Sequence, residues 1–164
     1  MKARSFDHSA SVPTLGLVLD GAEFLYPPPD AFAPFVPNAL NVEPWPLGTV
    51  TGTDLLAWLG GAFTQRPLLG LTGRALWDSE GVAVRGLSPL GSGVALVSTR
   101  SLTPESLLGV VRHEVGHAFG MDHCECWDCA LSQRPHPLPV QDRPPAFCPR
   151  CQERWDALCR SGKP

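Results

Sequence analysis

The sequence has little charge and no cluster of basic residues. Asp, Glu, Lys and Arg make up 18% of its 164 residues, and the formal net charge is -3 at pH 7. A nucleic-acid groove or an anionic membrane surface requires clustered Lys and Arg. We therefore expect neither nucleic acid nor membrane among the partners. A small neutral or peptidic partner fits the composition better.

Long apolar runs are also missing. The run from Leu15 to Leu19 ends at Asp20, and it lacks the longer apolar region and the small-residue cleavage site of a signal peptide. No stretch approaches the roughly 20 apolar residues that a membrane-spanning helix needs. We expect a soluble, cytoplasmic protein that acts as a monomer. Without an export signal, its six cysteines are better explained by metal ligation than by disulfides.

Proline, in contrast, is abundant, and it is concentrated in two segments, residues 26–46 and 135–149. Proline has no backbone donor and restricts the residue before it, so neither segment can run far as a helix or a central strand. We expect both segments to be loops on the surface.

The rest of the chain follows the periodicities of a mixed α/β protein. Thr53 is a candidate N-cap of the first of two helices, and Thr103, followed by Pro104, of the second. Gly120 can take the left-handed conformation that closes this second helix. The sequence predicts strands at 14–20, 68–73, 81–87 and 93–98, with a hairpin between the last two, and helices at 53–65 and from 103 to 120.

Histidine is scarce, yet three of the five histidines lie between positions 113 and 123. On a helix, His113 and His117 project from one face about one turn apart and can reach a single zinc ion. If the helix ends at Gly120, the chain can turn back and bring His123 to the same ion. Three nitrogen ligands with an open fourth position are typical of a catalytic zinc site, beside which Glu114 can act on a water molecule.

The alternative is that these are ordinary surface or core histidines. The short pattern HExxH does arise by accident. From this chain's own residue frequencies, however, the full pattern HExxHxxGxxH is expected by chance only on the order of 10⁻⁵ times. The zinc site is the better interpretation.

This motif is that of the metzincin zinc metallopeptidases. A cysteine directly after the third histidine, another five residues later and a distal CxxC resemble the archaemetzincin (archaelysin) family within that clan. The resemblance covers roughly residues 68 to 151. It implies two zinc ions per chain. The implied ligands of the catalytic zinc are His113, His117 and His123, and those of the structural zinc are Cys124, Cys129, Cys148 and Cys151.

The resemblance also implies a fold and a mechanism. The fold is α/β (α+β): one metzincin-like domain over residues 1–164. Residues 1–123 would form a small twisted mixed sheet with an active-site helix, and residues 124–164 an irregular C-terminal subdomain with the Cys₄ zinc site. Glu114 would be the general base in peptide-bond hydrolysis. An extended peptide substrate would pair with residues 81–87 as an edge strand.

Two features leave alternatives open. The generic spacing C-x₂-C-x₁₈-C-x₂-C would select Cys126 as a structural ligand, whereas the family pattern selects Cys124, which we prefer. The family also has a methionine beneath the histidines where this chain has Leu131, a change that nearly conserves volume. Leu131 keeps open an inactive zinc-binding or interaction protein with the same fold, although Glu114, which a non-catalytic site does not need, argues against it.

Overall fold

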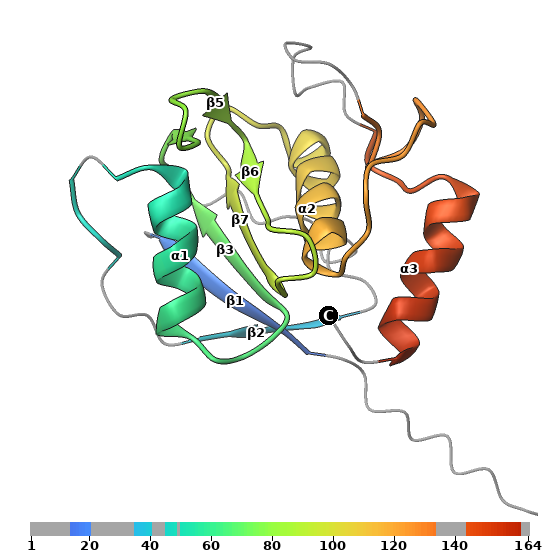
Figure 1. The fold of residues 1–164 in the computed structure, drawn as a ribbon, viewed down its shortest axis with the longest axis horizontal. Helices are drawn as coiled ribbons and strands as arrows, with labels where there is room; N and C mark the ends of the chain where they lie inside the picture. The colour runs from blue at the N-terminus through green and yellow to red at the C-terminus, as the bar shows by residue number, and fades with distance from the viewer. Residues whose placement is uncertain (1–13, 21–34, 41–44, 49, 134–143, 162–164) are drawn as a thin grey trace, which may run out of the picture.

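The computed structural model describes residues 14–20, 35–40, 45–48, 50–133 and 144–161. Its centre is a five-stranded sheet with the strand order β2-β1-β3-β7-β6 (Figure 1). The pairs β1–β2, β1–β3 and β3–β7 are parallel, and β6 is antiparallel to β7. The strands are β1 Thr14–Asp20, β2 Val36–Ala39, β3 Leu68–Thr72, β6 Gly86–Leu87 and β7 Val94–Ser98, with β4 Leu76–Trp77 and β5 Ala83–Val84 in a separate two-stranded sheet.

Alternating side chains of the central strands supply two apolar cores, one on each face of the sheet. Leu69 and Val97 belong to the core that α2 (Pro104–Ala118) covers. Leu68 and Leu96 belong to the core that α1 (Gly52–Ala62) covers. Figure 1 accordingly shows α1 and α2 on opposite sides of the sheet. The predicted mixed sheet packed against a long helix is confirmed.

Helix α2 begins and ends where its sequence indicates. The side chain of Thr103 accepts a hydrogen bond from the amide of Ser106, and Pro104 occupies the first turn. At the other end Gly120 adopts φ +82°, and the amides of Gly120 and Met121 donate to the carbonyls of His117 and Gly116. This bonding pattern is that of a Schellman motif. It turns the chain sharply just before His123.

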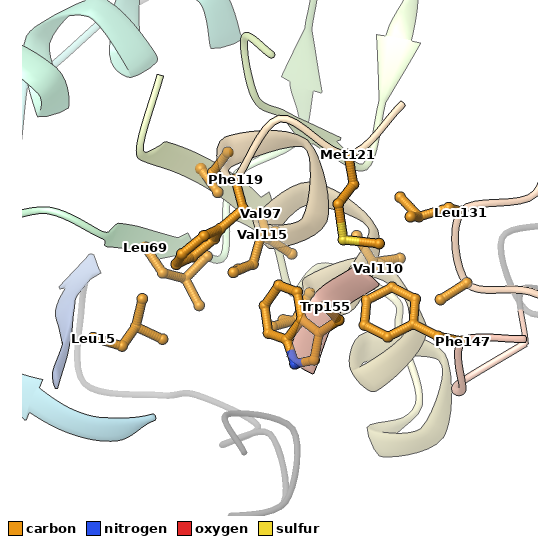
Figure 2. Packing of buried hydrophobic residues seen from close by; sticks show 14 of the residues in the cluster. Leu15, Leu69, Val97, Val110, Val115, Phe119, Met121, Leu131, Phe147 and Trp155 are labelled. Atoms are coloured by element: carbon orange, nitrogen blue, oxygen red, sulfur yellow. The ribbon is translucent and has the colours of Figure 1, made fainter. Parts of the chain in front are cut away.

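Helix α3 (Pro149–Ser161) packs beyond α2 through aromatic rings. Trp155 lies between Phe119 and Phe147 (Figure 2), with ring centroids 5.3 and 5.4 Å away. The same helix buries Cys159, and this burial raises the pKa of its thiol to about 11. Cys159 is therefore a core residue, as its place in a helical pattern indicates.

Three predictions about the elements need correction. The segment 81–87 is not one strand. It contains two short strands, β5 and β6, which are separated by Arg85 and belong to different sheets. The cap of α1 is Thr51, which exchanges hydrogen bonds with Asp54, instead of Thr53. The proline-rich segment 26–46 contains strand β2, which tolerates Pro37 because it lies at the edge of the sheet.

Much of both proline-rich segments lies outside the described residues, including 134–143. Among the residues that are described, no helix combines the length and apolarity needed to cross a membrane.

Candidate metal centres

The structure brings together the three histidines that the motif singled out. His113 and His117 lie on the last turns of α2, and His123 follows the turn at Gly120. The Nε2 atom of His117 lies 3.0 Å from that of His113 and 3.2 Å from that of His123. Three ring nitrogens therefore converge on one point. His113 is buried, whereas His123 is exposed, so this point can be reached from solvent.

Backbone carbonyls orient two of these rings. The Nδ1 atom of His113 lies 2.8 Å from the carbonyl oxygen of Ala130, and that of His117 lies 2.8 Å from the carbonyl oxygen of Met121. A carbonyl only accepts, so each Nδ1 carries the proton and each Nε2 presents a lone pair. Sequence reasoning missed both carbonyls, because any residue type supplies one.

The distances between the nitrogens suit a zinc ion. Tetrahedral zinc with Zn–N bonds of about 2.0 to 2.1 Å separates its nitrogen ligands by about 3.3 Å. The two Nε2 separations in this structure, 3.0 and 3.2 Å, are close to that value. Neutral nitrogens at this spacing make a metal ion a good fit for the site.

The structure also gathers four sulfur atoms into a second group. The Sγ atoms of Cys124, Cys129, Cys148 and Cys151 lie within 4.8 Å of one another. Those of Cys124 and Cys148 are 3.8 Å apart, close to the separation of about 3.8 Å expected for Zn–S bonds of about 2.3 Å in a tetrahedron. Cys126 is exposed and is not a member of this group. Its amide instead donates to the sulfur of Cys124 at 3.4 Å.

The environment of the thiols differs from one to the next. Burial raises the pKa of Cys129 and of Cys151. A hydrogen bond from the backbone of Cys151 lowers the pKa of Cys148 to about 7. Four thiolates packed together require a compensating positive charge. A divalent cation supplies it, and zinc is the usual partner of a Cys₄ set.

Leu131 occupies the floor beneath the histidines. It is fully buried, and a methyl group on Gly116, which lies between His113 and His117 in α2, would come within 3.1 Å of its Cδ2 atom. Figure 2 shows Leu131 close to Met121 in the core below α2. A leucine thus fills the space in which the family pattern has methionine.

Glu114 points toward the edge strand of the sheet. Its side chain is 8% exposed, and β6 passes so close that only the hydrogen of Gly86 fits against it. Beyond β6, the amides of Gly91 and Gly93 donate to the carbonyls of His117 and Ala118, at 2.8 and 2.9 Å. The loop after the edge strand therefore donates hydrogen bonds to two of the last carbonyls of α2.

A polar cavity of about 530 Å³ lies beside His123. Side chains of both charges line it, among them Asp122, Glu125, Arg150 and Arg154. The guanidinium group of Arg154 also donates to the carbonyl of Gly120, at 3.1 Å. This contact connects α3 to the turn that precedes His123.

Comparison with known proteins gives matches in sequence over the site. The family model described as Peptidase family M54 matches residues 97–156. An archaemetzincin from Methanopyrus kandleri is 34% identical over 107 residues, which cover 61% of this chain and 60% of that protein. Another, from Aeropyrum pernix, is 37% identical over 78 residues, 43% of each chain. The matches thus span less than two thirds of these curated relatives.

Solved structures match over nearly the whole chain. The crystal structure of archaemetzincin from Methanopyrus kandleri has a TM-score of 0.72 at 24% identity, covering 92% of this chain and 97% of that one. The structure from Archaeoglobus fulgidus also has a TM-score of 0.72, at 20% identity, covering 86% of this chain and 99% of that one. At these identities the likeness establishes the fold.

Proposed function

We propose that the chain is a member of the archaemetzincin family and a zinc metallopeptidase that hydrolyses peptide bonds. The observation that carries the proposal is the convergence of three histidine Nε2 atoms at the end of the helix that also carries Glu114. The proposed substrates are peptides or proteins. An inactive zinc-binding protein is the alternative that the test below distinguishes.

We propose two zinc ions with different roles. His113, His117 and His123 would hold the catalytic ion, and the four-cysteine group defined above would hold the structural one. The structural ion would tie residues 124–164 into a C-terminal subdomain of the single domain. Two observations support this arrangement: His123 and Cys124 are adjacent, and Ala130, whose carbonyl orients His113, directly follows Cys129.

Zinc held by three histidines supplies an activated water and polarises a carbonyl group. Residues of the chain would transfer the proton and hold the zinc ligands in place. Glu114 would take a proton from the attacking water and deliver it to the nitrogen of the leaving amine, so that the carboxylate is regenerated as the C–N bond breaks. The carbonyls of Ala130 and Met121 would hold the rings of His113 and His117 in place throughout.

Strand β6 would bind the substrate. Among the described strands it is the outermost of the five-stranded sheet on the side of Glu114, and one of its sides pairs with β7. An extended peptide would add to its other side through backbone hydrogen bonds. This places the scissile bond near the histidines without requiring a particular side chain.

The test replaces Glu114 by an isosteric residue that cannot accept the proton. Glu114→Gln should fold and keep its zinc, and it should lose peptide hydrolysis by at least about a hundredfold, since general base catalysis contributes that much. His117→Ala should instead release the catalytic zinc. Metal content and cleavage of a diverse peptide library measure both effects. A wild type that cleaves nothing with its metal bound, or a Glu114→Gln variant as fast as wild type, would favour the zinc-binding alternative.

A further inference from the structure

Gly86 of the edge strand lies against the side chain of Glu114, the proposed general base. A methyl group at this position would lie 2.5 Å from Cγ, 2.7 Å from Oε1 and 2.8 Å from Cδ of Glu114. Non-bonded carbon atoms normally stay about 3.5 to 4.0 Å apart. Even the methyl group of alanine would therefore overlap the Cγ, Cδ and Oε1 atoms of Glu114.

The strand cannot easily retreat from this contact. Gly86 is in register with Val97 of β7, and the carbonyl of Arg85 accepts a hydrogen bond from the amide of Ser98 at 2.8 Å. At its other end, the loop after β6 is bonded to the last carbonyls of α2 through Gly91 and Gly93. The strand and the helix are thus connected on both sides of the contact.

Glu114 can compensate only by rotating its side chain. Its backbone lies inside α2, and its side chain is buried. An added side chain on β6 would turn the carboxylate away from its present position, because rotating a side chain costs less than breaking the bonds that hold β6.

We propose that Gly86 is a positioning residue: the absence of its side chain lets the substrate-binding edge strand lie directly against Glu114 and fixes where that carboxylate points. This inference rests on the proposed function. It adds that one residue sets the position of both the backbone that binds the peptide and the group that moves the proton. A misplacement of about 1 Å at such a site can lower a rate by about a hundredfold.

The first arm of the experiment is kinetic. Gly86→Ala should lower kcat at least about tenfold while metal content stays unchanged, because no histidine is touched. KM should change much less, since alanine keeps the backbone groups that pair with a peptide. The matched control is Gly70→Ala in β3, where an added methyl group would lie 2.7 Å from Cδ2 of Leu59 in the core under α1. This control has a comparable steric clash away from the site, and it should retain the wild-type kcat.

The second arm needs no activity. Gly86→Ala should lower Tm by about 2 to 12 °C, as overpacking does. In the Glu114→Ala background, where Cγ, Cδ and Oε1 are gone, the same substitution should leave Tm nearly unchanged. If Gly86→Ala alone does not fold, the Gly86→Ala/Glu114→Ala variant should fold, and its failure to do so would count against the contact.

Two results overturn the inference. One is a Gly86→Ala variant with wild-type kcat and KM. The other is an equal loss of Tm with and without the Glu114 side chain. The two proposals fail separately. A wild type without peptidase activity contradicts the proposed function alone. The Tm comparison would then still decide whether Gly86 contacts Glu114 as inferred.

Discussion

At the scale of single residues, two cysteines two positions apart have different environments. Cys124 belongs to the four-sulfur group, while Cys126 is exposed and reaches that group only through its amide. The backbone explains this selection. Cys124 bridges to Ser132 in a parallel arrangement, with its amide donating to the carbonyl of Leu131 at 2.8 Å. This pairing holds residue 124 next to the segment that carries Cys129.

Serine substitutions separate the two cysteines. Cys124→Ser should lose the proposed structural zinc and lower the free energy of unfolding by roughly 3 kcal/mol or more, because one of its four ligands is removed. Cys126→Ser is the matched control and should change it by no more than about 0.5 kcal/mol, as exposed substitutions usually do. Metal analysis and urea unfolding measure both. Loss of zinc from Cys126→Ser alone would show that the generic spacing was the better guide.

The limits of sequence analysis are also clear at this scale. The positions of His113, His117 and His123 follow from helical spacing and one glycine turn, so the motif alone brings them together. The choice of Cys124 came from the family resemblance and not from spacing. The carbonyls of Ala130 and Met121, which orient two of the histidine rings, could not be predicted from the sequence. Their role depends on the direction of the backbone and not on residue type.

At the scale of elements, long periodic segments were predicted well and short ones were not. Helix α2 and the strands β1, β3 and β7 have enough residues to establish a period and to carry caps. The segment 81–87 contains two strands of two residues each. Strands so short show no alternation, and their separation depends on which partner strand each one meets. Thr51 and Thr53 are both acceptable caps, and the partner Asp54 decides between them.

The N-caps of α1 and α2 permit a test of how the histidines are held. Thr103→Ala and Thr51→Ala should each lower the free energy of unfolding by about 1 kcal/mol through loss of the N-cap. Neither should change zinc content, because the histidine end of α2 is held by its own turn and by the amides of Gly91 and Gly93. Zinc loss in Thr103→Ala but not in Thr51→Ala would mean that the far end of α2 also controls the site. Denaturant titration with metal analysis is the measurement.

At the scale of the whole molecule, the two candidate metal centres are parts of one structure. The core under α2 contains residues from the strands, from α2, from the segment between α2 and α3, and from α3, including Leu69, Val110, Cys129 and Trp155. The histidine group and the cysteine group are connected along the chain at His123 and Cys124, and through space from Ala130 to His113. We expect the state of one centre to affect the geometry of the other.

Removal of metal should therefore proceed in order. We expect two zinc equivalents, of which a mild chelator removes one first, because a three-histidine site keeps an exchangeable position and a Cys₄ site is closed. Peptidase activity should fall with the first equivalent and Tm mainly with the second. As a control, His117→Ala should retain only the slowly lost equivalent. A single equivalent in carefully prepared wild type would contradict the two-site arrangement.

The two outer strands of the sheet have a consequence for self-association. A long, regular strand edge offers unpaired backbone groups to other chains and promotes aggregation. Among the described strands, the edges of the five-stranded sheet are β2, four residues long with Pro37 inside it, and β6, only two residues long. Pro37 lacks a backbone donor, and β6 is too short to seed an extended ladder. The strand that would accept a peptide is therefore short enough to give a second copy of the same chain little to pair with.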